Sequence, residues 1–409
     1  MLDIKFIREN PDKVKEGCQK KGVKCQISQI LELDKKRREY LKQIENLKAQ
    51  QNKLGKSEIK QAQALKAQIK KTEPNLEQIE KELQGLMLQV PNLPQDDVPV
   101  GKDEKDNVVL REWGKKTKFS FKPKDYLEIA EKLDLIDVKR AAKASGTRFG
   151  YIKREAALLE FALVNLAFDT LAKEKFIPII PPVMLKSEMA RGMGYLEQGD
   201  KEDAYYLPKD DLYLVGTSEQ SIGVMHADEV FTEKDLPCRY AGFSTCFRRE
   251  AGSYGKDTKG IIRVHQFDKI EMFSFCHPEK SRAEHQFLLR MEEKLMQLLK
   301  IPYRVIQMCT ADIAHPQSAK YDIEAWLPGQ NQYRETHSTS TCTDFQARRL
   351  NIRYRSKKGL EFVHTLNGTA FAIGRMLIAI IENYQQKDGS IEVPKALQKY
   401  TGFKKIGRG

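Results

Sequence analysis

Residues 247–252 of this 409-residue chain are Phe-Arg-Arg-Glu-Ala-Gly, and residues 263–271 are Arg-Val-His-Gln-Phe-Asp-Lys-Ile-Glu. A loop rich in Gly and Lys, residues 253–260, lies between them, and β-branched and aromatic residues continue to position 275. We interpret the stretch as strand, loop and strand, with arginines at both ends of a basic loop. Because a guanidinium offers phosphate oxygens a planar fork of fixed positive charge, this arrangement predicts a site for a triphosphate.

Three further clusters combine hydroxyls, carboxylates and arginines. They are residues 216–219, residues 333–338 followed by 344–349, and residues 364–369 followed by Arg375 on an apolar helix. Carboxylates beside such arginines are able to hold Mg²⁺, a cation that prefers oxygen ligands. One cluster alone is more often a surface salt-bridge patch, but four together favour a nucleotide-binding enzyme. The sequence has neither a P-loop nor a dinucleotide-binding fingerprint, which disfavours those folds.

The composition argues against several other classes of protein. Charged residues make up 31% of the chain and hydrophobic residues 40%, a balance typical of a globular protein. No stretch approaches the ~18 apolar residues of a membrane-spanning helix, and the acidic N-terminus lacks the apolar core of a secretory signal. The seven cysteines are scattered without a C-x-x-C pair, so we expect reduced thiols and a cytoplasmic protein without a membrane partner.

Most of the excess positive charge lies in one periodic segment. The chain has a net charge of +13, and residues 20–72 hold 15 basic and 5 acidic residues, a balance of +10. Apolar residues recur at threes and fours over 30–54 and over 62–90, which predicts an antiparallel helical hairpin about 40 Å long, kinked at Pro74. On periodicity alone this is a solvated helical pair. The block Lys35-Lys36-Arg37-Arg38 favours contact with a nucleic-acid backbone.

A stretch rich in Pro, Asp and Gly, residues 90–107, indicates a domain boundary. We predict an N-terminal domain over residues 1–100, with the hairpin at about 27–90, and a second domain over residues 101–409. The second domain mixes strand-like and helical runs, so we expect an α+β fold. Its ~300 residues are enough to bury one large core.

The strings Phe-Arg-x-Glu-Ala-Gly and Arg-Val-His-Gln-Phe-x-Lys-Ile-Glu are similar to the second signature motif of class II aminoacyl-tRNA synthetases in its seryl version. The other clusters resemble the matching stretches of the seryl-tRNA synthetase family, in the same order, over essentially the whole chain. The resemblance implies a catalytic domain with a six- to seven-stranded antiparallel β-sheet flanked by helices, preceded by a tRNA-binding coiled-coil arm. It also implies a homodimer whose interface includes the first class motif, here residues 175–182.

The same resemblance implies a two-step reaction. L-serine and ATP form seryl-adenylate and pyrophosphate, and serine is then transferred to the 3′-terminal adenosine of tRNA(Ser). In the family the helical arm of the protein reaches the long variable arm of this tRNA. Lys35, Lys36, Arg37 and Arg38 are therefore expected to contact the tRNA backbone, and the choice of tRNA is expected to depend on its shape. The sequence leaves open whether tRNA(Sec) is also charged.

Positions that match the family motifs take the family's roles. Arg248 and Arg375 are expected to bind the α- and γ-phosphates of ATP, and Glu335 with Ser338 to bind Mg²⁺. Further contacts to ATP are expected from Arg249, Glu250, Arg263, Val264, Thr336 and His337. The serine pocket is expected to contain Thr217, Ser218, Glu219, Glu271, Asn367 and Thr369. Buried polar groups of this kind penalise an analogue that lacks the hydroxyl.

The sequence departs from the family pattern at three places. Ser218 stands where alanine is common, Lys175 where the first motif usually has glycine, and Thr339-Ser340-Thr341 where the family more often carries cysteine. None of the three removes a residue assigned to the chemistry. The Cys/His ligand set of the rare zinc-dependent form is absent from the sequence, so no catalytic zinc is expected.

Two alternatives remain open on sequence. One is a tRNA-independent paralogue that activates a small amino acid for a carrier protein, although such relatives usually lack the basic arm. The other is a coiled-coil nucleic-acid binder without catalysis, which leaves the arginine–carboxylate clusters unexplained. A pyrophosphate-exchange assay across the amino acids separates these alternatives from a serine-activating enzyme.

Overall fold

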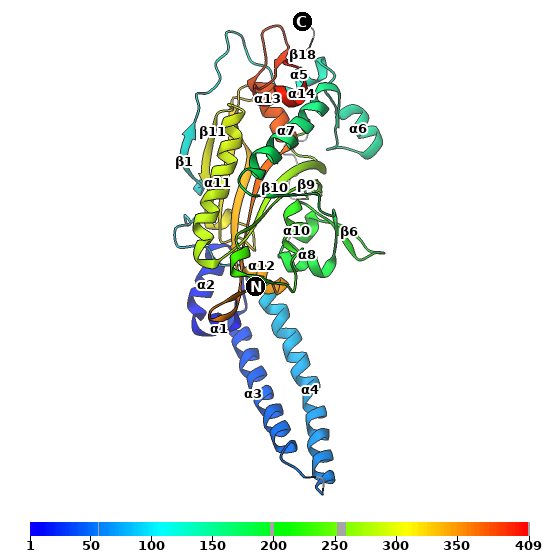
Figure 1. The fold of residues 1–409 in the computed structure, drawn as a ribbon, viewed down its shortest axis with the longest axis vertical. Helices are drawn as coiled ribbons and strands as arrows, with labels where there is room; N and C mark the ends of the chain where they lie inside the picture. The colour runs from blue at the N-terminus through cyan, green and yellow to red at the C-terminus, as the bar shows by residue number, and fades with distance from the viewer. Residues whose placement is uncertain (56, 197–199, 252–258, 408–409) are drawn as a thin grey trace. The chain divides into compact units, whose positions relative to one another are not determined.

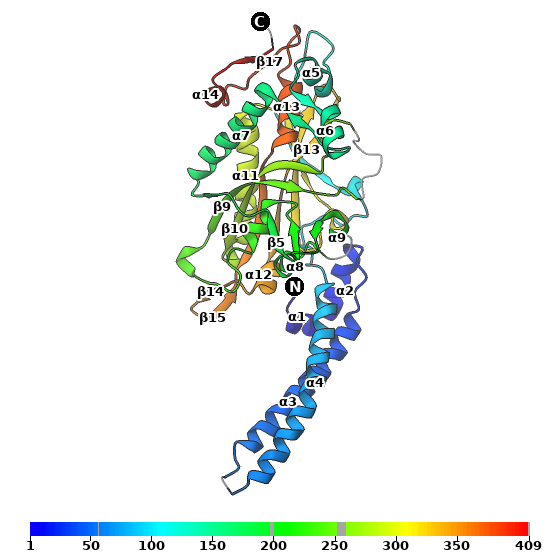
Figure 2. The same ribbon diagram turned by 90° about the vertical axis from the view of Figure 1, so that its right-hand side faces the viewer.

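The computed structural model describes residues 1–55, 57–196, 200–251 and 259–407. The chain forms two compact units, Met1–Leu93 and Pro94–Gly409 (Figures 1 and 2). The division lies inside the Pro- and Asp-rich stretch 90–107. Gly252 of the opening motif and residues 253–258 of the basic loop lie outside the described residues, as does Lys56 in the turn of the predicted hairpin.

The N-terminal unit consists of two short and two long helices. They are α1 (Ile4–Glu9), α2 (Pro11–Lys20), α3 (Ile27–Gln51) and α4 (Ile59–Leu88). The long helices α3 and α4 run side by side as an antiparallel pair in both views (Figures 1 and 2). Their seam buries apolar side chains at the predicted spacing, among them Ile30, Leu33, Ile44, Ile69 and Leu83. Pro74 lies inside α4, which continues through it as one helix.

Charged residues also hold this unit together. Arg37, a seam position, reaches across the hairpin, and its Nε lies 2.9 Å from Glu80 Oε1. Asp34 is only 1% exposed and accepts hydrogen bonds from Arg8 Nη1 at 2.8 Å and from Arg38 Nε at 3.1 Å. A buried carboxylate needs such partners. Arg37 and Arg38 of the basic block therefore have structural contacts within the unit.

The C-terminal unit is built on an eight-stranded sheet, in the order β1-β11-β12-β13-β16-β10-β9-β4. The strands are β1 (Val108–Trp113), β4 (Ile177–Ile179), β9 (Cys238–Phe247), β10 (Gln266–Cys276), β11 (Tyr303–Gln307), β12 (Ala319–Leu327), β13 (Gln332–Thr343) and β16 (His364–Ala372). Seven of these strands form the antiparallel sheet that was predicted with six to seven strands, and β4 adds an eighth. Six neighbouring pairs are antiparallel, and the edge strand β4 pairs with β9 in parallel. The remaining edge strand, β1, follows the linker-like stretch.

Three long helices supply most of the core that covers this sheet. They are α7 (Arg154–Ala172), α11 (Ser281–Leu298) and α13 (Ile373–Asn383), whose buried leucines, isoleucines and methionines pack with Ile270, Val305 and Ile323 of the strands. In Figure 1 these helices are green, yellow-green and orange. None of the helices formed by the described residues has the length and apolarity that crossing a membrane requires.

Smaller elements complete the unit. The helices are α5 (Tyr126–Lys132), α6 (Val138–Ser145), α8 (Ser187–Met193), α9 (Asp200–Asp203), α10 (Ser218–Gly223), α12 (Phe345–Leu350) and α14 (Gln398–Thr401). Two three-stranded sheets have the orders β5-β7-β6 (Met184–Lys186, Leu212–Leu214, Tyr205–Leu207) and β15-β14-β8 (Gly359–Phe362, Arg353–Ser356, Val230–Thr232). Two-stranded pairs are formed by β2 (Ile136–Asp137) with β3 (Tyr151–Ile152) and by β17 (Ile391–Glu392) with β18 (Lys405–Ile406).

Lys175 occupies the turn from α7 to β4, one of the three departures from the family pattern. Its φ is +64°, in the left-handed region that glycine adopts without steric cost. Lys175 donates its N–H to Ala172 O and Phe176 donates its N–H to Leu171 O, so the turn closes normally. The side chain is exposed, and a lysine at this φ carries backbone strain that glycine would not.

Candidate active site

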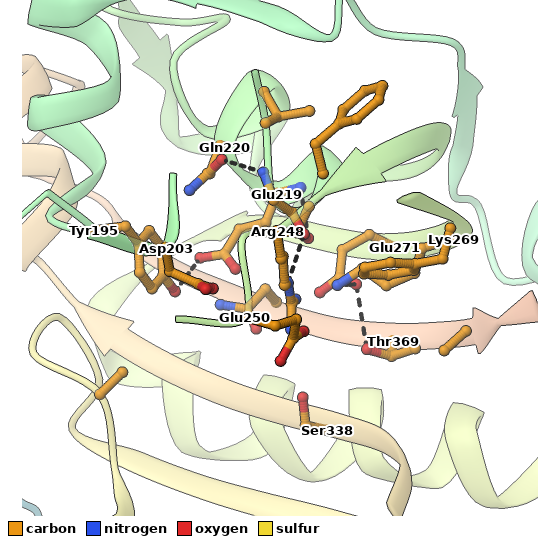
Figure 3. A pocket seen from close by; sticks show the side chains of 18 of the residues that line it. Tyr195, Asp203, Glu219, Gln220, Arg248, Glu250, Lys269, Glu271, Ser338 and Thr369 are labelled. Carbon is orange, nitrogen blue, oxygen red and sulfur yellow. Dashed lines mark hydrogen bonds and ion pairs between the residues drawn. The ribbon is translucent and has the colours of Figure 1, made fainter. Parts of the chain in front are cut away.

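A cavity of about 620 Å³ lies in the C-terminal unit, and strands β10, β12, β13 and β16 contribute to its lining (Figure 3). The segment from β7 into α10 and the segment that follows β9 supply further residues. Thirteen of the predicted site residues line it: Thr217, Glu219, Arg248, Glu250, Arg263, Val264, Glu271, Glu335, Thr336, Ser338, Asn367, Thr369 and Arg375. The fold thus brings the four sequence clusters to one cavity.

Two irregularities in the sheet decide which side chains reach this cavity. Between β12 and β13, Ile323 pairs with His337 and Glu324 pairs with Glu335, so Thr336 is an extra residue. Glu335 and Thr336 therefore both line the cavity, although successive strand residues normally point to opposite faces. A second register shift lies between β10 and β16, where Ile270 pairs with Phe371 and Glu271 pairs with Thr369.

Arg248 is held in the cavity by contacts on two sides. Its Nε donates a hydrogen bond to the carbonyl oxygen of Gly216 at 3.1 Å, and its guanidinium carbon lies 5.2 Å from the ring centroid of Phe267. In Figure 3 the side chain extends into the space between Glu219 and Glu271. A second cation, Arg263, forms an ion pair of 2.6 Å with Glu250 on the cavity wall. Fixed guanidinium groups of this kind suit a phosphate ligand.

Glu335 is an ionised carboxylate surrounded by cations. Its Oε1 lies 3.0 Å from Arg375 Nη1, which also donates a hydrogen bond to the Glu335 carbonyl oxygen at 3.1 Å. Burial raises the pKa of this carboxyl. The charges of Arg375, Lys320 and Arg248 outweigh burial and lower the pKa to about 2. Glu335 is therefore negative throughout the neutral range.

Lys320 and Asp322 add a second charged pair beside Glu335. Lys320 lines the cavity, and its Nζ lies 3.1 Å from Asp322 Oδ2. Burial lowers the pKa of Lys320, but the charges of Asp322 and Glu335 outweigh it and the pKa is raised. Burial dominates at Asp322, whose pKa is raised to about 7. Lys320 is therefore a permanent cation of the cavity.

Two buried carboxylates face the other part of the cavity. Glu219 is 5% exposed and accepts hydrogen bonds from Tyr195 Oη at 2.7 Å and from Gln346 Nε2 at 3.3 Å. Burial and the nearby Glu271 raise its pKa to about 7, more than these hydrogen bonds lower it. Glu219 thus titrates near neutral pH and suits a cationic ligand that favours its charged form.

Glu271 is 2% exposed and lies beside a cation and a hydroxyl. Its Oε2 lies 2.7 Å from Lys269 Nζ and accepts a hydrogen bond from Thr369 Oγ1 at 3.3 Å (Figure 3). Burial raises the pKa of Glu271, against the charge of Lys269. Nearby, Ser340 Oγ donates to Asn367 Oδ1 at 2.9 Å, which directs the amide nitrogen away from Ser340. This Nδ2 has no hydrogen-bond partner among the described residues. The pocket therefore offers carboxylate, hydroxyl and amide groups to a small polar ligand.

Three predicted residues do not line the cavity. Ser218 is fully buried and donates its hydroxyl to the Gly242 carbonyl oxygen at 3.0 Å, so the buried hydroxyl has a partner. Arg249 extends the other way, donating Nε to Ala204 O at 3.0 Å with its guanidinium carbon 4.5 Å from the Tyr205 ring centroid.

His337 belongs to the opposite face of β13. It is 1% exposed, packs edge-on against Phe371, and burial lowers its pKa to about 3. The neutral ring is therefore part of the core rather than a group available to a ligand. Strand alternation explains its position, since Thr336 and Ser338 on either side of it line the cavity.

Several cavity residues were missed by sequence reasoning: Tyr195, Phe267, Lys269, Asp312, Gln317 and Lys320. Phe267 and Lys269 lie inside the quoted motif and were within reach of it, whereas Tyr195 carries no local signal. Glu292 on α11 was also missed. It is fully buried, and its Oε1 lies 3.1 Å from the Cβ position that a side chain at Gly368 would occupy. Burial raises its pKa well above the ordinary value, and the carboxyl lies against β16 at Gly368.

Glu335 and Ser338 offer the oxygen ligands that Mg²⁺ prefers, a charged carboxylate and a hydroxyl on the same strand. One carboxylate is too few for an all-protein site, and among the described residues no three His, Cys, Asp or Glu side chains are grouped to hold a metal. This donor set fits a Mg²⁺ ion that keeps waters and shares phosphate oxygens of a nucleotide.

Comparison with known proteins gives a consistent result for both units. Residues 205–384 match the family model "tRNA synthetase class II core domain (G, H, P, S and T)", and residues 1–94 match "Seryl-tRNA synthetase N-terminal domain". The serine–tRNA ligase of Dictyoglomus turgidum is 47% identical over an alignment of 421 positions, gaps included, and the alignment covers 99% of each chain.

Solved structures agree with these matches. The crystal structure of seryl-tRNA synthetase from Pyrococcus horikoshii complexed with ATP has a TM-score of 0.93 and 42% identity, and the alignment covers 100% of both chains. The cytoplasmic serine–tRNA ligase from Naegleria fowleri in complex with AMP has a TM-score of 0.91 and 34% identity, covering 99% of this chain and 98% of that one.

Proposed function

The chain belongs to the seryl-tRNA synthetase family, and from this membership we propose how its cavity and its helical arm share the reaction. The enzyme attaches L-serine to tRNA with ATP, by way of seryl-adenylate and with release of pyrophosphate and AMP. The predicted class II fold with an N-terminal helical arm is confirmed. The observation that carries the proposal is the single cavity in which fixed cations adjoin two buried carboxylates.

The cationic part of the cavity binds ATP. Arg248 contacts the α-phosphate and stabilises the negative charge that builds there as the serine carboxylate attacks in line. Arg375, held by Glu335, contacts the γ-phosphate. Glu335 and Ser338 are the residues that would hold Mg²⁺, which would neutralise phosphate charge when bound. Glu250, Arg263 and Val264 border the nucleotide on the opposite wall.

The buried carboxylates bind serine. Glu219 with Thr217 takes the amino group, and Glu271 with Thr369 takes the hydroxyl end, where Asn367 closes the pocket. Alanine leaves these buried polar groups without a partner. The binding of alanine is therefore weaker than that of serine by on the order of 1–3 kcal/mol for each unpaired group. Threonine has to be excluded by the size of the pocket.

The pH dependence of serine binding tests the role of Glu219. Because its pKa is raised to about 7, the carboxyl is protonated below that pH and does not pair with the serine ammonium group. We expect the KM for serine in pyrophosphate exchange to rise as pH falls below about 7, approaching tenfold per pH unit, while the KM for ATP stays constant. Glu219→Gln should raise the KM for serine and remove this pH dependence. A KM for serine that is constant from about pH 5.5 to 8 contradicts the assignment.

We propose that the N-terminal unit binds tRNA(Ser) through exposed lysines of the arm rather than through the whole basic block. Lys36 pairs with Glu32 at 2.7 Å, Arg37 with Glu80 and Arg38 with Asp34. Lys35 and Lys42 are exposed, and neither forms an ion pair with another of the described residues. Seven residues apart, they lie on one face of α3, about 10 Å apart along the helix, and offer two positive charges to the phosphates of an RNA backbone.

A double variant tests this proposal. Lys35→Ala with Lys42→Ala should lower kcat/KM for tRNA charging about tenfold and leave serine-dependent pyrophosphate exchange unchanged. The salt dependence of charging should also become shallower, by about 0.7–0.9 in the logarithmic slope for each lysine–phosphate pair that the variant removes. Arg37→Ala is the structural control, since losing the pair with Glu80 lowers Tm, which the lysine variant does not. Equal losses in exchange and charging contradict a role in tRNA binding.

We also propose a homodimer formed through α7 and β4. The exposed side chains there are large and apolar: Leu158 is 52% exposed, Phe161 61%, Ile177 49% and Ile180 80%. A group of exposed, large apolar side chains is typical of a subunit interface. It includes the predicted first class motif, residues 175–182. The seven free thiols support a cytoplasmic location for this dimer.

A further inference from the structure

A series of hydrogen bonds begins at a backbone N–H beside the cavity and ends at a side chain that lines it. It starts in the segment between η4 (Thr310–Asp312) and β12, where Gln317 donates its N–H to the Ala314 carbonyl oxygen at 3.0 Å. The Ala314 N–H in turn donates to Gln317 Oε1 at 2.9 Å. These two reciprocal bonds close a turn around the side chain of Gln317, which lines the cavity.

The first donor fixes the direction of every bond that follows. A backbone N–H only donates, so Gln317 accepts from Ala314 with its amide oxygen and has Nε2 left to donate. Gln317 Nε2 donates to Ser340 Oγ at 3.1 Å, and Ser340 Oγ donates to Asn367 Oδ1 at 2.9 Å. Ser340 is 1% exposed and stands opposite Asn367 in the pairing of β13 with β16. We call the side chains of Gln317, Ser340 and Asn367 the amide relay.

The last member of the amide relay offers a donor to the cavity. Asn367 is 4% exposed and lines the cavity, and its Nδ2 has no hydrogen-bond partner among the described residues. Its backbone carbonyl oxygen separately accepts from Thr339 Oγ1 at 2.7 Å, so the strand position of Asn367 is held without the side-chain amide. Two residues further along β16, Thr369 donates to Glu271 Oε2 at 3.3 Å. A buried amide donor and a buried carboxylate acceptor therefore border the same cavity.

We propose that Gln317 and Ser340 are positioning residues that set which end of the Asn367 amide meets the amino-acid substrate, and that this orientation favours serine. The serine hydroxyl has one hydrogen and two lone pairs, so it donates to Glu271 and accepts from Asn367 Nδ2. Alanine does neither and leaves both buried groups unpaired. This role rests on the proposed serine pocket and adds the residues that fix the pocket's polarity.

Gln317→Glu reverses the polarity of the amide relay with little change of shape. The new side chain keeps an oxygen that accepts from the Ala314 N–H, but its second oxygen cannot donate to Ser340. The Ser340 hydroxyl then donates to that oxygen and offers its lone pairs to Asn367. The Asn367 amide turns over to donate Nδ2 to Ser340, and Oδ1 faces the cavity. Two acceptors, Oδ1 and Glu271, then compete for the single hydrogen of the serine hydroxyl.

Pyrophosphate exchange by the full-length enzyme, with serine and with alanine, tests this role. For Gln317→Glu we expect the KM for serine to rise about tenfold or more, with a smaller change in kcat. The ratio of kcat/KM for serine to that for alanine should fall by a similar factor, and the KM for ATP should stay constant. Ser340→Ala removes the donor to Asn367 without adding a charge, and it should change the same quantities in the same direction.

Gln220→Glu is the matched control for the added charge. Gln220 also lines the cavity, and its Oε1 also accepts from a backbone N–H, that of Gly216, at 2.9 Å. The change places the same negative charge in the same cavity without altering a member of the amide relay. The serine-to-alanine ratio should therefore equal that of the parent enzyme. An equal fall of the ratio in this control overturns the proposal, because charge rather than amide orientation would then explain the loss.

A double-mutant cycle with Asn367→Ala separates the amide relay from the pocket itself. If Gln317 acts through Asn367, adding Gln317→Glu to Asn367→Ala should raise the KM for serine no further. Effects that multiply overturn the relay. If Asn367→Ala raises the KM for serine and Gln317→Glu does not, the serine pocket stands and the relay is overturned. If Asn367→Ala leaves this KM unchanged, the proposed place of Asn367 in the serine pocket is wrong and the relay fails with it.

Discussion

Arg248→Ala lowers serine-dependent pyrophosphate exchange by about 10²- to 10³-fold, the loss seen when one preorganised group that stabilises transition-state charge is removed. The physical reason is the position of the guanidinium. The Gly216 carbonyl and the Phe267 ring hold it in the cavity before any substrate binds, so it does not have to reorganise as charge develops on the α-phosphate. The loss should appear mainly in kcat, because the charge that Arg248 meets is largest in the transition state.

Arg249→Ala is the matched control. The two arginines are neighbours in one motif, and the sequence assigned both to ATP. Arg249 instead donates to Ala204 O and packs on Tyr205, outside the cavity lining. Its replacement should change exchange less than about tenfold, with a small loss of Tm. Equal losses for the two variants, measured with the same serine and ATP concentrations, would show that the cavity geometry does not identify the catalytic arginine.

Glu335→Gln should reduce exchange by about 100-fold, which corresponds to roughly 3 kcal/mol of transition-state stabilisation. Glutamine retains an oxygen able to accept the hydrogen bond from Arg375 but removes the negative charge that holds Mg²⁺. The variant should therefore require a higher free Mg²⁺ concentration for half-maximal exchange. Since the pKa of Glu335 is lowered to about 2, this carboxylate stays ionised above about pH 4 and contributes no acid limb to the pH profile in the neutral range.

Glu324→Gln is the control for this second variant. Glu324 pairs with Glu335 in strand register, but its carboxylate lies 2.6 Å from Arg304 and is not part of the cavity lining. Its replacement should leave the Mg²⁺ requirement unchanged. If Glu335→Gln lowers the rate without shifting the Mg²⁺ requirement, Glu335 acts by positioning Arg375, and its assignment as a metal ligand is wrong.

Local sequence identified residues that line the cavity, but it did not give the directions of their side chains. Glu335 and Thr336 both reach the cavity because a register shift inserts one extra residue, which strand alternation alone excludes. His337 follows that alternation away from it, whereas Arg249 lies after the end of β9 and turns toward Ala204 and Tyr205. The block at Lys35 to Arg38 shows the same limit, because the partner of Arg37, Glu80, lies on the other helix of the hairpin.

Sequence alone was enough to establish the helical hairpin, the separate α+β unit and the family, because heptad spacing, linker composition and motif strings are properties of short stretches of chain. The folded chain was needed to show which of these side chains share a cavity, and how Glu219 and Glu335 come to have opposite pKa shifts. These properties depend on burial and on charges from strands distant in sequence. Electrostatic and packing energies follow distance in space, whereas a sequence pattern reports only distance along the chain.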